Sequence, residues 1–142
     1  MDSSGDAPVC NIDRKGIASR RLSAQVMRTI LTGLVLVNAA HAKYNFAVLQ
    51  DDWRKTLLLW GAIDALSVGA FITQAQVDEK TCVVHGLVRT EVEGPESMRP
   101  RRVKVAHKAD LLFWRSVRMI ARGLALGNAV AVAAIAAPYV LL

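Results

Sequence analysis

The sequence predicts an all-α membrane protein with about three transmembrane helices, counted as two to three. Three observations predict this class. The last twenty residues, 123–142, carry no charge, and twenty helical residues reach ~30 Å, the thickness of the hydrocarbon core of a bilayer. The 142-residue chain is 53% hydrophobic. Its formal net charge is nevertheless +6, which suits anionic lipid headgroups better than nucleic acid, since a nucleic-acid binder would not need an uncharged apolar tail.

The first part of the chain, 1–28, is predicted to be a polar and basic tail. Residues 14–28 contain five basic residues and no acid, and could form the polar start of a membrane helix. A secretory signal ending at Ala40-His41-Ala42 is the rival interpretation. It is disfavoured because the basic region is unusually long. A mitochondrial transit peptide also fits poorly, because the first thirteen residues hold three aspartates and no base.

Residues 29–77 are predicted to form a membrane helical hairpin. Its first span would run over 29–49, although the uncharged run before Lys43, residues 29–42, is only fourteen residues long, so a re-entrant or buried segment remains the alternative. Its second span, 56–77, contains one charged residue, Asp64. A carboxylate at that depth must be protonated, paired or facing water. It is interpreted either as structural or as part of a proton or ion relay.

The extramembrane connector is predicted over 78–110. Residues 81–92 are rich in β-branched side chains and 102–107 alternate, with the turn signal Gly94-Pro95-Glu96-Ser97 between them. This pattern allows a β-hairpin, and an irregular connector is equally open. Residues 111–142 are predicted to form one long C-terminal helix that contains the third span.

Three spans place the N-terminus and residues 78–122 on one side of the membrane. That side holds fifteen of the 18 Lys and Arg residues, and the other holds only Lys43, Arg54 and Lys55. Such a bias marks the cytoplasmic or the matrix side. The aromatic residues Tyr44, Trp53, Phe113, Trp114 and Tyr139 fall at the predicted interfaces.

Small residues recur every four positions on two of the predicted spans. Such stripes allow another helix to approach closely. We therefore interpret them as helix-packing residues, and they are Gly61, Ala65, Gly69, Gly123, Gly127 and Ala131.

The predicted lipid- or partner-binding residues are basic. Arg115, Arg118 and Arg122 share one helical face at i, i+3 and i+7. They follow Arg101, Arg102, Lys104 and Lys108. We expect them to bind an anionic phospholipid such as cardiolipin or an acidic partner subunit, besides setting the topology.

Metal and catalytic motifs are weak or missing in the sequence. The three histidines, His41, His85 and His107, are predicted on different sides, which argues against a transmembrane bis-histidine haem. Cys82-x-x-His85 has ligand-like spacing, and His107 and Cys10, predicted on the same side, could complete a metal site, but without a second such pair the signal is weak. The chain has no P-loop, GxGxxG, GxSxG or HExxH motif. We expect no enzyme activity and no cofactor.

These features favour a non-catalytic accessory subunit of a multi-subunit membrane complex. Energy-transducing membranes hold many such subunits, so a respiratory-chain or ATP-synthase complex of the mitochondrial inner membrane is favoured on base rates. Its N-terminus and residues 78–122 would then face the matrix. A small membrane carrier or redox protein using Asp64 and His41 is the alternative, and a lone assembly factor or membrane anchor is a third hypothesis.

Overall fold

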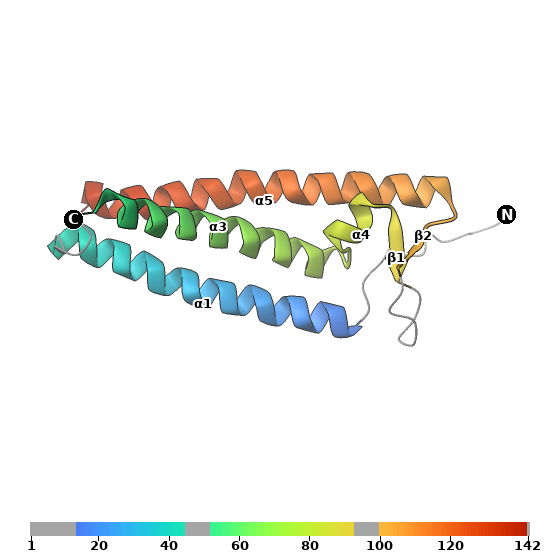
Figure 1. Cartoon of the computed structure of the whole chain (residues 1–142), viewed down its shortest axis with the longest axis horizontal. Coiled ribbons are helices and arrows are strands. Elements are labelled where there is room, and N and C mark those ends of the chain that lie inside the picture. The colour runs from blue at the N-terminus through green and yellow to red at the C-terminus, as the bar shows by residue number, and fades with distance from the viewer. Residues whose placement is uncertain (1–13, 45–51, 93–99, 142) are drawn as a thin grey trace.

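Three long helices lying side by side make up most of the molecule (Figure 1). The computed structural model describes residues 14–44, 52–92 and 100–141. The long helices are α1 (Arg14–Tyr44), α3 (Trp53–Asp78) and α5 (Ala106–Leu141). Helices α1 and α5 run in the same direction, and α3 runs antiparallel to both (Figure 1). All three are long and apolar enough to cross a membrane, so the predicted fold class is confirmed.

All three long helices begin before the spans that the sequence predicts, α3 by only three residues, at Trp53. Helix α1 begins at Arg14, so residues 14–28 are helical and extend the predicted first span by about four turns. Helix α5 begins at Ala106 instead of Leu111. The proposed continuation of the first span over 45–49 lies outside the described residues. Both α1 and α5 are therefore longer than a bilayer requires, and their basic first halves extend beyond the apolar part.

The apolar surface of the helices points outward instead of into the bundle. Only 11% of the most apolar window of α1 and of α5 is buried, and 22% of that of α3. Large side chains such as Leu36, Leu58 and Val132 are 65%, 74% and 65% exposed. In water this exposed surface would be unfavourable, but lipid tails would cover it. The arrangement indicates an integral membrane protein.

Cations on the three helices mark the two edges of one apolar band. Arg28 of α1 hydrogen-bonds Gln74 of α3, and Gly123, next to Arg122, lies against Ile72. Arg28 and Arg122 therefore lie at nearly the same level of α3. From Lys55 at the other end to Ile72, α3 rises ~25 Å. This thickness is close to that of a bilayer core.

Small residues of α5 provide the tight packing between α5 and α3. Gly123, Gly127 and Ala131 are all buried. A Cβ atom on Gly127 would lie 2.5 Å from the Cα atom of Val68, so only glycine allows the two backbones to lie this close. Closer to the start of α5, Leu112 and Met119 are fully buried and form part of the core.

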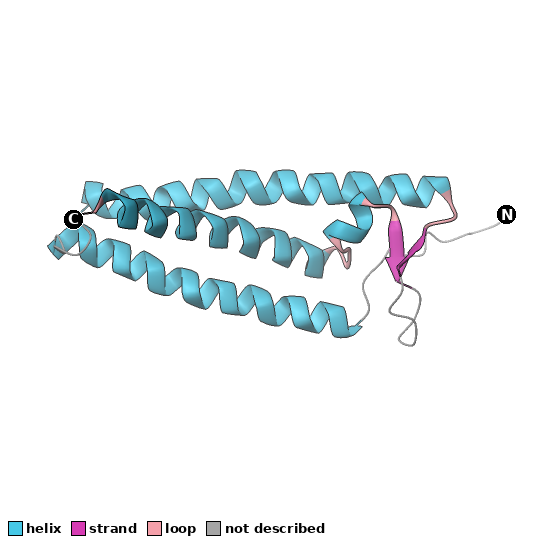
Figure 2. Cartoon of the chain, in the orientation of Figure 1, coloured by secondary structure: helices cyan, strands magenta, loops and turns pink. Residues whose placement is uncertain are grey.

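A small extramembrane unit packs against the first turns of α5 (Figure 2). It contains α4 (Val83–Leu87) and two three-residue strands, β1 (Thr90–Val92) and β2 (Pro100–Arg102), which pair antiparallel with Thr90 opposite Arg102. This pairing is the β-hairpin that the sequence allowed, but its strands are confined to 90–92 and 100–102, and residues 83–87 form α4 instead. Their β-branched side chains are overridden at α4 by packing on α5, where Gly86 lies against the Leu112 carbonyl and Ser116. The turn at 94–97 lies outside the described residues.

Candidate interaction sites

A buried polar cluster joins all three long helices at the end where α1 finishes. Asn38 of α1 is completely buried. Its Nδ2 donates to the carbonyl oxygens of Ala134 (3.4 Å) and Ile135 (3.2 Å) in α5. Its Oδ1 accepts from Trp60 Nε1 of α3 (3.0 Å) and from the Tyr139 hydroxyl of α5 (3.5 Å). One amide side chain thus uses both of its polar atoms between helices.

Pro138 explains why α5 needs a hydrogen-bond donor from another helix at this point. Proline has no N–H, so the carbonyl of Ala134, four residues earlier, loses its helical hydrogen bond. A free carbonyl is costly in a membrane, where no water replaces the missing donor. Asn38 supplies N–H groups to this carbonyl and to its neighbour. The proline and the asparagine, a hundred residues apart in sequence, are therefore matched.

Aromatic rings complete this cluster. The Tyr139 ring meets the rings of His41 and Trp60 edge to face, with centroids 6.5 and 6.2 Å apart. His41 is only 7% exposed. The structure therefore places His41 within the helix-packing cluster rather than at an open surface.

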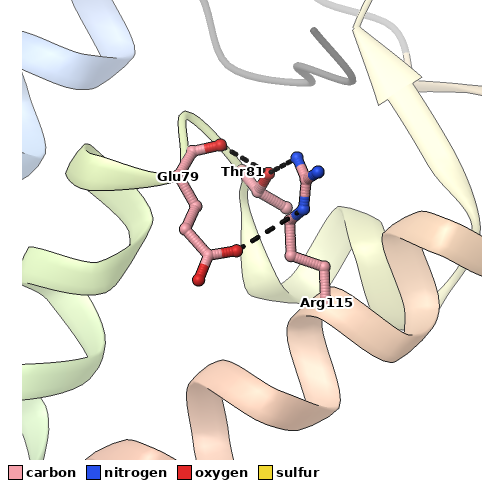
Figure 3. Close-up of polar contacts among 3 residues, drawn as sticks. All are labelled: Glu79, Thr81 and Arg115. Carbon is pink, nitrogen blue, oxygen red and sulfur yellow. Dashed lines mark hydrogen bonds and ion pairs between the residues drawn. The ribbon is translucent and has the colours of Figure 1, made fainter. Parts of the chain in front are cut away.

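A second polar group ties the end of α3 to α5 (Figure 3). Arg115 Nε forms an ion pair with Glu79 Oε2 at 3.4 Å, and its NH1 donates to the Thr81 hydroxyl at 3.5 Å. That hydroxyl donates in turn to the Glu79 carbonyl at 2.9 Å. Thr81 is completely buried. This group holds the extramembrane unit at the base of α5.

A left-handed residue at the end of α3 brings Thr81 into position. Lys80 has φ 48°, a conformation that usually falls to glycine at the end of a helix. The Lys80 and Thr81 N–H groups donate back to the Val77 and Gln76 carbonyls at 3.4 and 3.1 Å. This pairing turns the chain sharply after α3, so that α4 can start at the side of α5.

Arg20 connects α1 to the same region. Its Nε donates to Gln76 Oε1 (3.3 Å) and its NH2 contacts the sulfur of Cys82 (3.2 Å). Gln76 Oε1 also accepts from the Val83 N–H at 3.2 Å. Cys82 is buried and is not in a disulfide. Arg20, although basic and near the expected interface, therefore has an internal structural role.

The predicted basic residues have different surroundings. Arg115 is half-buried and bonded as described, whereas Arg118 and Arg122 are exposed on α5. Arg102 and Lys104 are also exposed and line a pocket of about 430 Å³ with Arg89. Lys108 is half-buried near the start of α5, and Arg101 lies in β2. Arg118 and Arg122 are thus accessible to a ligand, whereas Arg115 is bound to Glu79 and Thr81.

The small residues of α3 differ from those of α5. Gly61 and Ala65 are exposed, and a Cβ atom on Gly61 would meet nothing within 4 Å. Gly69 faces α1, with Met27 Sδ 3.3 Å from its ideal Cβ position. Asp64, between Gly61 and Ala65, is half-buried and has no hydrogen bond or ion pair with any residue that the structure describes. This part of α3 is therefore an open face with an uncompensated acid.

The histidines and cysteines do not form a metal centre within the described part of the chain, where no three potential ligands come together. His85 Nδ1 lies 2.9 Å from the Thr90 hydroxyl, and His107 is exposed in the first turn of α5. Cys10 lies outside the described residues. The Cys82-x-x-His85 spacing is therefore accounted for by α4, in which His85 holds the start of β1.

Sequence reasoning missed the residues that join the helices most directly. Asn38, Trp60, Gln76 and Thr81 were not singled out, because each is a single polar residue in an apolar or mixed stretch. Pro138 carried the only usable signal: an intramembrane proline frees a carbonyl, which calls for a donor on a neighbouring helix. Comparison with protein-family models, curated proteins and solved structures gives no match for this chain.

Proposed function

We propose that the protein is a non-catalytic accessory subunit of a multi-subunit membrane complex, and that it binds its neighbours through the open face of α3. The observation that carries this proposal is Asp64, half-buried in the middle of α3, where the exposed residues over 57–71 are all apolar or small. A charged acid near the middle of a membrane helix costs ~2.5–3.5 kcal/mol on insertion scales when it has no partner.

A partner helix would remove this cost. Gly61 and Ala65 flank Asp64 and leave room for a second backbone, as small residues do at helix–helix contacts in membranes. The partner's chemistry follows from the acid: a transmembrane helix that offers a basic or hydrogen-bonding side chain near its middle. The exposed Arg118 and Arg122 would hold anionic lipid or an acidic partner segment at the boundary of the same complex.

The class of complex follows from base rates and from the charge bias of the chain. Energy-transducing membranes contain many small subunits of this kind, and we propose a respiratory-chain or ATP-synthase complex of the mitochondrial inner membrane. The strong bias of Lys and Arg toward one end of the bundle supports an orientation with the N-terminus and residues 78–122 on the matrix side.

Two matched glycine variants test the proposed interface. Gly61 and Gly33 are both exposed, and an added Cβ would meet nothing within 4 Å at either. Gly61→Leu and Gly33→Leu should therefore fold alike. After gentle detergent extraction, wild type and Gly33→Leu should co-migrate with a large complex in fixed ratio, and Gly61→Leu should not. Migration of wild type as a free monomer, or equal behaviour of the two variants, would contradict the proposal.

Asp64→Asn separates this function from a carrier or relay. An accessory subunit should lose partner retention when the acid is neutralised, because the contact that compensates it is weakened. A relay through Asp64 should instead lose transport while the assembly stays intact.

A further inference from the structure

A pocket lies between α1 and α3 at the cationic boundary of the apolar band. Its volume is about 270 Å³. It is lined by Arg28, Leu31, Ser67, Ala70, Phe71 and Gln74. Arg28 and Gln74 mark its polar end, and Ser67 lies two turns of α3 deeper, ~10 Å toward the middle of the band. The lining is therefore apolar with a cation at its outer edge.

Two polar groups in this pocket are incompletely satisfied. Arg28 donates to Gln74 Oε1 at 2.7 Å, which uses one of its five N–H groups. It forms no ion pair with any residue that the structure describes, and Gln74 itself donates to the Asp78 carboxylate at 2.8 Å. The Ser67 hydroxyl is 1% exposed and has no hydrogen-bond partner among the described residues. Such a buried hydroxyl is expected to find an acceptor.

We propose that this pocket holds part of one acyl chain of an anionic phospholipid, with the phosphate bound by Arg28. A phosphate would neutralise the arginine through charge-assisted hydrogen bonds. The ester carbonyls of a phospholipid lie on the tail side of its phosphate and are acceptors for a hydroxyl such as that of Ser67. A partner helix, 10–12 Å across, could not enter a pocket of this volume, whereas a single hydrocarbon chain can.

This site is separate from the open face of α3 and from Arg118 and Arg122. The inference depends on the proposed membrane placement but not on membership of a complex. Both can therefore fail independently: the lipid experiment uses the isolated full-length chain, and the complex experiment uses the assembled one.

Native mass spectrometry of the full-length protein in detergent, with equal amounts of phosphatidylglycerol and phosphatidylcholine of matched chains, tests the site. The wild-type protein should retain one phosphatidylglycerol molecule in preference to phosphatidylcholine. Arg28→Gln should lower this preference about fivefold, the equivalent of the ~1 kcal/mol that a basic residue near the surface contributes. Arg21→Gln is the matched control, because Arg21 is exposed on the same helix, and it should keep the wild-type preference.

A second variant tests the pocket itself. Ser67→Leu would fill the pocket and should displace the lipid while Arg28 remains. Circular dichroism should show unchanged helix content for all three variants. Equal losses with Arg21→Gln and Arg28→Gln, no preference for phosphatidylglycerol in wild type, or unchanged retention in a folded Ser67→Leu would each overturn the proposal. A lipid-free dimer as the main species would overturn it as well.

Discussion

Replacing Asn38 with leucine is expected to destabilise the bundle by about 1–3 kcal/mol. The change keeps the size of the side chain but removes the donor to α5 and the acceptor for Trp60. The two shorter bonds, to Ile135 (3.2 Å) and from Trp60 (3.0 Å), should contribute most, because the other two are at 3.4 and 3.5 Å. Hydrogen bonds between membrane helices contribute ~0.6 kcal/mol on average and ~1.7 at most, and two of them give the range above.

Asn38 and Pro138 should be energetically coupled, and a double-mutant cycle can measure this coupling. Pro138→Ala restores an N–H to α5, so that the Ala134 carbonyl no longer depends on Asn38. The cost of Asn38→Leu should therefore fall in the Pro138→Ala background by up to ~0.6 kcal/mol, the average for one such bond. The parts of the cost that come from Trp60 and from Ile135 should remain, because Pro138 removes the helical donor of Ala134 alone.

Reversible unfolding by SDS in mixed micelles, followed by far-ultraviolet circular dichroism, would measure these differences. Thr29→Leu is the control, because the Thr29 hydroxyl bonds only to a carbonyl of its own helix and is exposed. It should change the free energy of unfolding by ~0.5 kcal/mol or less. Strictly additive effects of Asn38→Leu and Pro138→Ala would refute the matching of the two residues.

Three further stability predictions can be measured in the same way. Arg115→Gln should cost ~1 kcal/mol, because the half-buried ion pair with Glu79 and the contact with Thr81 are lost. Replacement of the exposed Arg118 with Gln should be close to neutral. Equal effects of the two changes would contradict the structural role of Arg115. Gly127→Ala should cost ~1–3 kcal/mol, since its methyl group would push α3 away at Val68, and Gly61→Ala in the isolated chain should cost nothing or stabilise the helix. Asp110→Asn should change stability by less than ~1 kcal/mol, because its ion pair with Arg89 is more than half exposed; a larger loss would mean that this pair holds the extramembrane unit.

The three long helices could be predicted because their signals are long and additive. Twenty uncharged residues or a 22-residue stretch with one acid leave few alternatives to a membrane helix. The start of α1 was harder to predict from the sequence, because residues 14–28 are basic and carry no apolar run. Their helical conformation depends on contacts from other parts of the chain, such as those of Arg20 with Gln76 and Cys82.

The interaction sites were less predictable, because composition does not show which side of a helix is occupied. The four-residue stripes of α3 and α5 look alike in the sequence, yet Gly127 lies against Val68 while Gly61 is open. Arg115 and Arg118 belong to one predicted face, yet among the residues that the structure describes only Arg115 of the two forms an ion pair with an acid. Local preference also failed over α4, where Val83 and Val84 are helical because their turn packs on α5.

The distance between the two charged ends of the bundle has a consequence for where the protein can reside. An apolar depth of ~25 Å is shorter than the ~32–33 Å core of a sterol-rich plasma membrane and close to the ~27 Å of a thin one. In the thicker bilayer, Arg28 and Lys55 would be drawn toward the acyl chains, or the lipids beside the protein would have to compress. Hydrophobic mismatch alone should thus favour retention in thinner membranes, independently of any targeting sequence.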